Sequence, residues 1–227
     1  MRRLGVVLIV CGALFSGAWS GAVAASPKPP PRSPFNATIA LVPDLQARAK
    51  QMVIGARDLP KGWEIDPRWS AGEVAKLGPE WSCNGHTADL SGLVVKGAWS
   101  ARSQLLNDSG DPSLVTSTAV VLASPEQAQM LFDVGRTYYP KYCEIVRKPQ
   151  PGGVVVALAE LKLPHVAEQQ TRFRTAFLTP ISADWRDFIL LRRGPVLGIL
   201  EFSRPGKPFP ARLENAIINT FAARFHG

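Results

Sequence analysis

The spacing of hydrophobic residues in the first half of the chain predicts two amphipathic helices. One helix is expected to begin at Pro43, because apolar residues then recur on a single helical face, at Leu45, Ala49, Met52 and Val53. Gly55 is expected to end this helix in a left-handed conformation. The second helix is predicted to begin at a capping box, with Ser124 at the cap, Pro125 next and Gln127 three positions on. Pro140 is expected to end or kink it.

Two strands are predicted between these helices, after a short strand that follows Trp63 and a long loop over residues 67–90. The first strand has an apolar set of alternate residues, Val95, Gly97, Trp99 and Ala101. The set between them is Lys96, Ala98, Ser100 and Arg102. This alternation is typical of an antiparallel sheet with one covered and one wet side. The second strand is the segment from Leu114 to Ala123, which is rich in valine and threonine.

The second half of the chain is predicted to be mostly strands. Strands are expected over 154–163 and 171–178, where Phe173, Thr175 and Phe177 alternate with Arg172 and Arg174. Two further strands flank Gly194-Pro195 and are expected to pair as a hairpin, over 188–193 and 196–202. A third helix starts near Pro210 and carries an apolar residue at every fourth position, Leu213, Ile217, Phe221 and Phe225. The predicted fold is α+β: an antiparallel β-sheet of about six or seven strands with the helices packed on one face.

The N-terminus has the pattern of a cleavable secretory signal. Arg2 and Arg3 precede an apolar run of about 15 residues, and small residues ending in Ala24 follow it. An uncleaved anchor is the alternative, but a spanning helix needs about 20 apolar residues. We therefore predict a signal peptide over 1–24, a proline-rich spacer over 25–38 and a single domain over 39–227. The mature protein is expected to be secreted or extracytoplasmic, with no stable membrane span.

The charge of the chain narrows the possible partners. Its formal net charge is +8, and removal of Arg2 and Arg3 with the signal leaves +6. The remaining cations are scattered, without a basic stripe interleaved with aromatic residues, so nucleic-acid binding is excluded. A basic surface of this kind suits anionic envelope polymers or lipid headgroups without specifying one. We expect a monomer that binds an unknown small molecule or cell-envelope component.

The cysteines predict one disulfide bond. Cys11 leaves with the signal, which keeps Cys83 and Cys143 as an even pair in an exported protein. Closing a loop of about 60 residues would stabilise the fold by up to about 4 kcal/mol in the chain-entropy model. Two free thiols remain the alternative.

Several short motifs resemble those of the extracellular sensor-like domains of actinobacteria, including the one of the mycobacterial kinase PknH. They are Asp58-Leu59-Pro60-Lys61-Gly62-Trp63, Trp81-Ser82-Cys83, Leu93-Val94-Val95-Lys96-Gly97, Ser124-Pro125-Glu126-Gln127-Ala128 and Arg192-Arg193-Gly194. A Mog1/PsbP-like secreted sandwich is a second similar architecture. The resemblance implies an antiparallel sheet with flanking helices and a ligand cleft. This chain differs from the kinase domain in its number of cysteines. The kinase domain resembles a two-disulfide fold, whereas this chain has one predicted pair.

No catalytic, cofactor or metal motif stands out. Cys83 and His86 have the spacing of metal ligands, but zinc needs more ligands than these two. Asp184 and Asp187 are interpreted as part of a polar turn before the hairpin. The candidate ligand-binding residues are aromatic, because such side chains line ligand clefts: Trp69, Trp81 and Trp185. The predicted function is non-catalytic binding in a sensor-like role; an envelope hydrolase with a fold-assembled site is the alternative.

Overall fold

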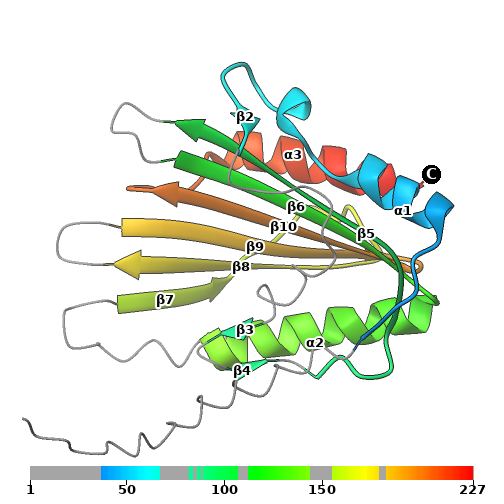
Figure 1. The fold of residues 1–227 in the computed structure, drawn as a ribbon. Helices are drawn as coiled ribbons and strands as arrows, with labels where there is room; N and C mark the ends of the chain where they lie inside the picture. Colours follow the sequence, from blue (N-terminus) through cyan, green and yellow to red (C-terminus); the bar gives the residue numbers. More distant parts are fainter. Residues whose placement is uncertain are drawn as a thin grey trace, which may run out of the picture. The chain divides into compact units, whose positions relative to one another are not determined.

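A computed structural model shows how these elements are arranged (Figure 1). It describes residues 37–66, 82–83, 86–87, 89–106, 112–143, 155–178 and 183–226. The predicted signal peptide over 1–24 and most of the predicted spacer over 25–38 lie outside these residues.

One eight-stranded sheet forms the centre of the described structure. Six long antiparallel strands run through it in the order β5-β6-β10-β9-β8-β7. Their bounds are β5 Val94–Leu106, β6 Pro112–Leu122, β7 Val155–Glu160, β8 Gln169–Leu178, β9 Ala183–Arg193 and β10 Val196–Pro205. Two short strands join β5: β1 (Thr38–Ile39) is parallel to it and β2 (Glu64–Ile65) is antiparallel. The sheet is therefore mixed, whereas the sequence predicts an antiparallel one, because a two-residue strand carries no readable alternation.

The helices cover both faces of the sheet, so the prediction that they pack on one face is wrong. Helices α1 (Pro43–Met52) and α3 (Ala211–Ala223) lie on one face, and α2 (Pro125–Cys143) lies on the other (Figure 1). Two separate apolar clusters result, which we call the α3 side and the α2 side. Neighbouring residues of β6 belong to different clusters: Val121 packs on the α3 side and Val120 on the α2 side. Strands buried on both faces are hydrophobic at successive positions, as the central strands are here.

A bulge in β5 explains why its predicted alternation fails. The register with β6 shifts between Val95 and Gly97, which places Val95 on the α2 side and Trp99 on the α3 side. Ala98 and Ser100, expected on a wet face, are both buried. One extra residue in a strand reverses the direction of the side chains before it, so the sequence pattern and the observed faces disagree from that point.

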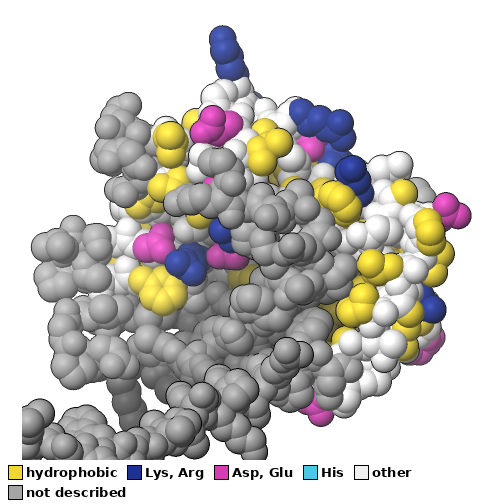
Figure 2. All heavy atoms as spheres, in the orientation of Figure 1, with side chains coloured by type: hydrophobic (Ala, Val, Ile, Leu, Met, Phe, Trp, Pro, Cys, Tyr) yellow, Lys and Arg dark blue, Asp and Glu magenta, His cyan; other side chains and the backbone are white. Residues whose placement is uncertain are grey.

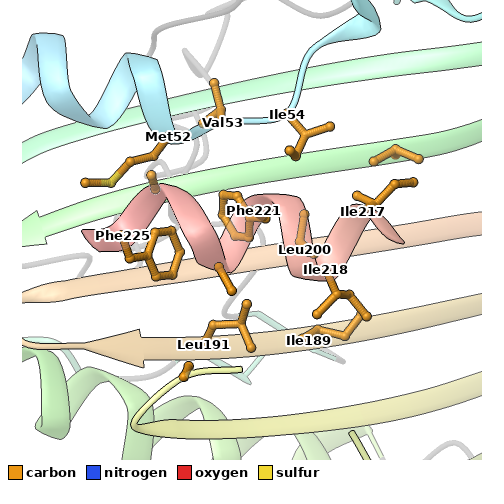
Figure 3. Packing of buried hydrophobic residues seen from close by; sticks show 14 of the residues in the cluster. Met52, Val53, Ile54, Ile189, Leu191, Leu200, Ile217, Ile218, Phe221 and Phe225 are labelled. Carbon is orange, nitrogen blue, oxygen red and sulfur yellow. The ribbon is translucent and has the colours of Figure 1, made fainter. Parts of the chain in front are cut away.

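Helix α3 packs on the sheet through large apolar side chains. Figure 3 shows Ile217, Ile218, Phe221 and Phe225 of this segment lying over Leu200 of β10 and over Ile189 and Leu191 of β9. The predicted helix is thus confirmed, with Phe225 in the 3₁₀ turn η5 (Arg224–His226) that follows it.

Two of the predicted helix boundaries differ from the structure. Gly55 is extended, with φ −113°, and its N–H donates to Asp58 Oδ2 at 2.9 Å at the start of the 3₁₀ turn η1 (Ala56–Asp58). Helix α2 continues past Pro140 to Cys143. At its start Ser124 Oγ accepts from the Gln127 N–H at 3.3 Å, which confirms the cap. The Gln127 side chain instead accepts from the Val94 N–H at 2.9 Å and so fastens α2 to β5.

Candidate functional site

Part of the sheet's α2 side carries polar side chains in place of an apolar core. We call this part the polar face. It comprises Ser100, Arg102 and Gln104 of β5, Thr116 and Thr118 of β6, Thr175 of β8, Arg186 of β9, and Glu201 and Ser203 of β10. The register places it on the α2 side, because the same cross-strand rows contain Ile199, Leu190 and Phe188, which pack in the α2-side cluster. Binding sites combine apolar side chains with a few precisely placed polar groups, and the polar face brings both kinds together on one side of the sheet.

The inner rows of the polar face are ordered by side-chain hydrogen bonds. Thr118 Oγ1 donates to Ser100 Oγ at 2.9 Å, and Arg102 Nε donates to Thr116 Oγ1 at 2.9 Å. Gln104 Nε2 donates to Glu64 Oε1 of β2 at 2.8 Å. Ser100, Gln104, Thr116 and Thr118 are buried, so their hydroxyl and amide groups are held in fixed positions.

Strands β9 and β10 carry the partly exposed and charged part of the polar face. Arg186 Nε donates to Asp184 Oδ2 at 3.2 Å, and Ser203 Oγ donates to Asp184 Oδ1 at 3.3 Å. The Arg186 guanidinium also lies over the Phe177 ring, 5.1 Å from its centroid. Figure 2 shows acidic, basic and hydrophobic side chains side by side near the ends of β8 and β9. This edge offers donors, acceptors and one aromatic surface to a ligand.

The described residues of the polar face include no histidine, so none of its serines has a histidine beside it in the strands. His165 lies exposed in the loop after β7, and the exposed His226 contacts Arg193. No group of three or more histidine, cysteine or acidic residues that could hold a metal occurs in the described part of the chain. What the polar face can do chemically is form hydrogen bonds and ion pairs.

A shallow pocket of about 480 Å³ lies where β7 ends beside the start of β8. Its lining residues are Glu160, Leu161, Lys162, Leu163, Gln170 and Thr171. The Gln170 amide orders the rim, because it accepts from the Val166 N–H at 2.8 Å and donates to the Pro164 carbonyl at 2.6 Å. Thr171 Oγ1 donates to Glu160 Oε1 at 3.2 Å. The pocket is polar like the polar face, but only two charged groups line it.

The opposite side of β8 and β9 carries a buried cluster of four charged residues, which we call the charge cluster. It consists of Arg172 and Arg174 of β8, Asp187 of β9 and Glu214 of α3. Arg174 binds Asp187 in a bidentate manner, with Nε–Oδ1 and Nη2–Oδ2 both at 2.6 Å. Arg172 Nη2 lies 2.6 Å from Glu214 Oε2 and 3.1 Å from Asp187 Oδ2. These bonds tie the first turn of α3 to the sheet.

Glu214 is an acid with a strongly perturbed pKa. Its pKa is raised to about 8, first because burial disfavours the charged carboxylate and second because Asp187 repels it. Arg172 and Arg174 act in the opposite direction. The pKa of Arg174 is raised by its hydrogen bond to Asp187. A buried acid of this kind is a candidate functional group, although structural ion pairs produce the same effect.

The tryptophan site that the sequence proposed stays a prediction, because the structure describes only one of its three residues, Trp185. Trp69 and Trp81 lie outside the described residues. Trp185 is half-buried in β9 and alternates with Arg186, so it belongs to the side opposite the polar face. Cys83 lies in β3 (Ser82–Cys83), which pairs with β4 (His86–Thr87) and lies beside α2, and Cys143 is the last residue of α2. The bond between these cysteines stays a prediction.

Sequence reasoning missed both polar features and misplaced two aspartates. Asp184 and Asp187 belong to strand β9, and Asp187 is buried with two arginines, so the predicted polar turn is wrong. A signal for the charge cluster was present. Glu214 stands four residues before Ile218 on the buried stripe of α3, where an unpaired charge would be costly. The alternating Arg172 and Arg174 supply its partners.

Comparison with known proteins identifies a solved structure with a similar fold. No protein-family model matches the sequence, and no curated protein matches it. A solved structure with a similar fold is the extracellular domain of PknH from Mycobacterium tuberculosis, with a TM-score of 0.53. The match covers 80% of this chain and 97% of that chain at 7% sequence identity. The resemblance predicted from the sequence is therefore confirmed at the level of the fold.

Proposed function

We propose that a chain with this fold is an exported, non-catalytic domain that binds a polar ligand on its polar face. The observation that carries the proposal is the presence of hydroxyl, amide and charged side chains in successive rows beside an apolar core. The pattern of the N-terminus supports an extracytoplasmic location. The fold of an extracellular kinase domain is compatible with the same location.

The chemistry of the polar face favours a ligand rich in hydroxyl and amide groups. The half-buried Ser203 hydroxyl can donate and accept, and Arg186 and Glu201 add charges of both signs. Such a set suits a glycan fragment of the cell envelope better than a lipid tail, which would need an apolar groove. Trp69 and Trp81 remain proposed ligand contacts. Trp185 lies on the side of the sheet opposite the polar face.

Equilibrium titration of the mature protein with soluble peptidoglycan fragments tests this proposal. The double variant Glu201→Gln with Ser203→Ala removes a charge and a hydroxyl from the β10 part of the polar face with little change in volume. We expect it to weaken binding by at least about tenfold, the equivalent of about 1.4 kcal/mol. Thr220→Val on the exposed face of α3 is the matched control and should bind as the wild type does. Equal affinity of both variants, or no saturable binding of any envelope glycan, would contradict the proposal.

An envelope hydrolase is the second candidate class, because a site can be assembled from segments far apart in the sequence. Ester, peptide and glycan substrates should show no turnover above background. Robust turnover that a single serine or carboxylate substitution abolishes would replace binding by catalysis as the function of the domain.

A further inference from the structure

Two carboxyl groups in the charge cluster meet at the same guanidinium nitrogens. Arg172 Nη2 contacts Asp187 Oδ2 at 3.1 Å and Glu214 Oε2 at 2.6 Å. Arg174 Nη2 contacts the same two oxygens at 2.6 Å and 3.7 Å. Asp187 is 2% exposed and Glu214 is 0% exposed, so water screens neither acid from the other.

The second oxygen of Glu214 has no donor. Glu214 Oε1 is buried and lacks a hydrogen-bond partner, and so does Arg172 Nε of the same cluster. An ionised Glu214 would therefore leave a carboxylate oxygen buried without compensation, which is costly. A proton on this carboxyl group removes the charge and supplies a donor for a neighbouring acceptor.

We propose that Asp187 and Glu214 form a proton-binding site, in which one proton holds α3 against β8 and β9. With the proton bound, the four residues carry two positive charges and one negative charge. Without it, two carboxylates face each other between the arginines. Two carboxylates that share a site do not both ionise readily, and the proton is carried by Glu214, whose charged form is disfavoured by burial and by the neighbouring Asp187.

The electrostatic surroundings support the proton-bound form at neutral pH. The pKa of Glu214 is raised to about 8 by burial, then by the charge of Asp187 and by a hydrogen bond with that residue. The groups that oppose this shift are Arg172 and Arg174, both on β8. Proton occupancy would thus change at mildly alkaline pH, well above the pKa of an ordinary glutamate.

Because the pKa of Glu214 is raised in the folded protein, the stability that this site provides depends on pH. Between the ordinary pKa of glutamate and about 8, the folded protein binds a proton that the unfolded chain has released. Stability from this site is therefore fully present at acidic pH, falls as the pH rises through this range, and is constant above it. At its steepest the folding equilibrium constant should fall about tenfold per pH unit.

Urea unfolding of the full mature chain at several pH values between about 5 and about 9 tests the proposal. Glu214→Gln carries a neutral side chain of the same shape at every pH. We therefore expect the free energy of unfolding of the wild type to fall relative to that of this variant as the pH rises from about 5 to about 8. Glu160→Gln, at an exposed site on β7, is the matched control and should keep the wild-type slope. A Glu214→Gln variant with the same pH dependence as the wild type would overturn the proposal.

A second measurement does not depend on the folding of any variant. Carbon NMR of the wild type with labelled glutamate carboxyl carbons should show one resonance that still titrates at about pH 8. If every glutamate resonance has finished its titration by about pH 6, no proton is held at this site. Both readouts are independent of ligand binding, so their failure would leave the proposed function of the polar face untouched.

Discussion

Two aspartates on β9 illustrate how strongly position changes the role of a residue. Asp187 is 2% exposed and binds both arginines of β8, whereas the Asp184 side chain is 37% exposed and pairs with the exposed Arg186. A buried ion pair contributes little net stability, but removal of one partner leaves the other charge buried and unpaired. An exposed pair is screened by water, so it contributes little net stability and little is lost when one partner is removed.

Replacement of Asp187 by alanine should therefore destabilise the protein far more than replacement of Asp184. We expect Asp187→Ala to lower the free energy of unfolding by about 3–5 kcal/mol, because Arg172 and Arg174 lose their shared partner. Asp184→Ala should cost less than about 1 kcal/mol. Urea denaturation at neutral pH measures both, and equal losses for the two variants would contradict the role of the cluster.

The difference between local and distant partners decides which residue roles can be predicted. Ser124 caps α2 through the N–H of Gln127, three residues away, so a short motif was enough to identify it. Arg172 binds Glu214, which is 42 residues away on another element. Nothing in the sequence around Arg172 specifies that partner, and an arginine alternating with phenylalanine also fits a solvated strand face.

At the scale of elements, helix α1 lies against β5 with no space for a side chain between them. A Cβ atom on Gly97 would lie 2.4 Å from the Leu45 carbonyl oxygen of α1. Because this neighbour is backbone, the whole helix would have to move. Gly97 thus permits the close approach of helix and sheet on the α3 side.

Gly97→Ala should destabilise the protein by about 1–3 kcal/mol through overpacking. Gly55→Ala provides the matched control, because no atom lies within 4 Å of its Cβ position and its φ of −113° suits any residue. We expect that variant to be neutral or more stable by about 0.4–1 kcal/mol. Thermal unfolding distinguishes the two, and an unaffected Gly97→Ala protein would show that α1 is not seated on β5 as described.

Elements with a local signal were predicted well. The hairpin of β9 and β10 turns at Gly194, which has a φ of 51°, and the register pairs Arg193 with Val196 as the motif indicated. The start of α1 at Pro43 was likewise readable. The short strands β1 and β2 and the bulge in β5 were not, since pairing with a distant strand creates them.

At the scale of the whole molecule, the predicted disulfide bond between Cys83 and Cys143 would connect two parts of the fold. Cys83 lies in β3 and Cys143 ends α2, and β3 lies beside α2. Replacing either cysteine by serine should lower the free energy of unfolding by about 2–4 kcal/mol, because the crosslink restricts the unfolded chain. Peptide mapping without reductant should recover the crosslinked pair. Free alkylation of both thiols in the native secreted protein would disprove the bond.

Export should remove the N-terminal segment near Ala24. The intact mass of the secreted protein is expected to match a chain that begins close to residue 25, without a lipid. A product that retains Met1 or carries diacylglycerol would contradict the assignment. Among the described residues, no helix is long and apolar enough to cross a membrane.

The sequence by itself determined the elements and the α+β class, because helix caps, turns and periodicities involve residues only a few positions apart. It also carried enough short motifs to indicate the fold of an extracellular kinase domain. The tertiary structure alone decided that helices cover both faces of the sheet, that Arg172 and Arg174 meet Glu214, and that polar residues of five strands form one surface. Strand order brings these residues together, and it depends on packing between segments that are far apart in the chain.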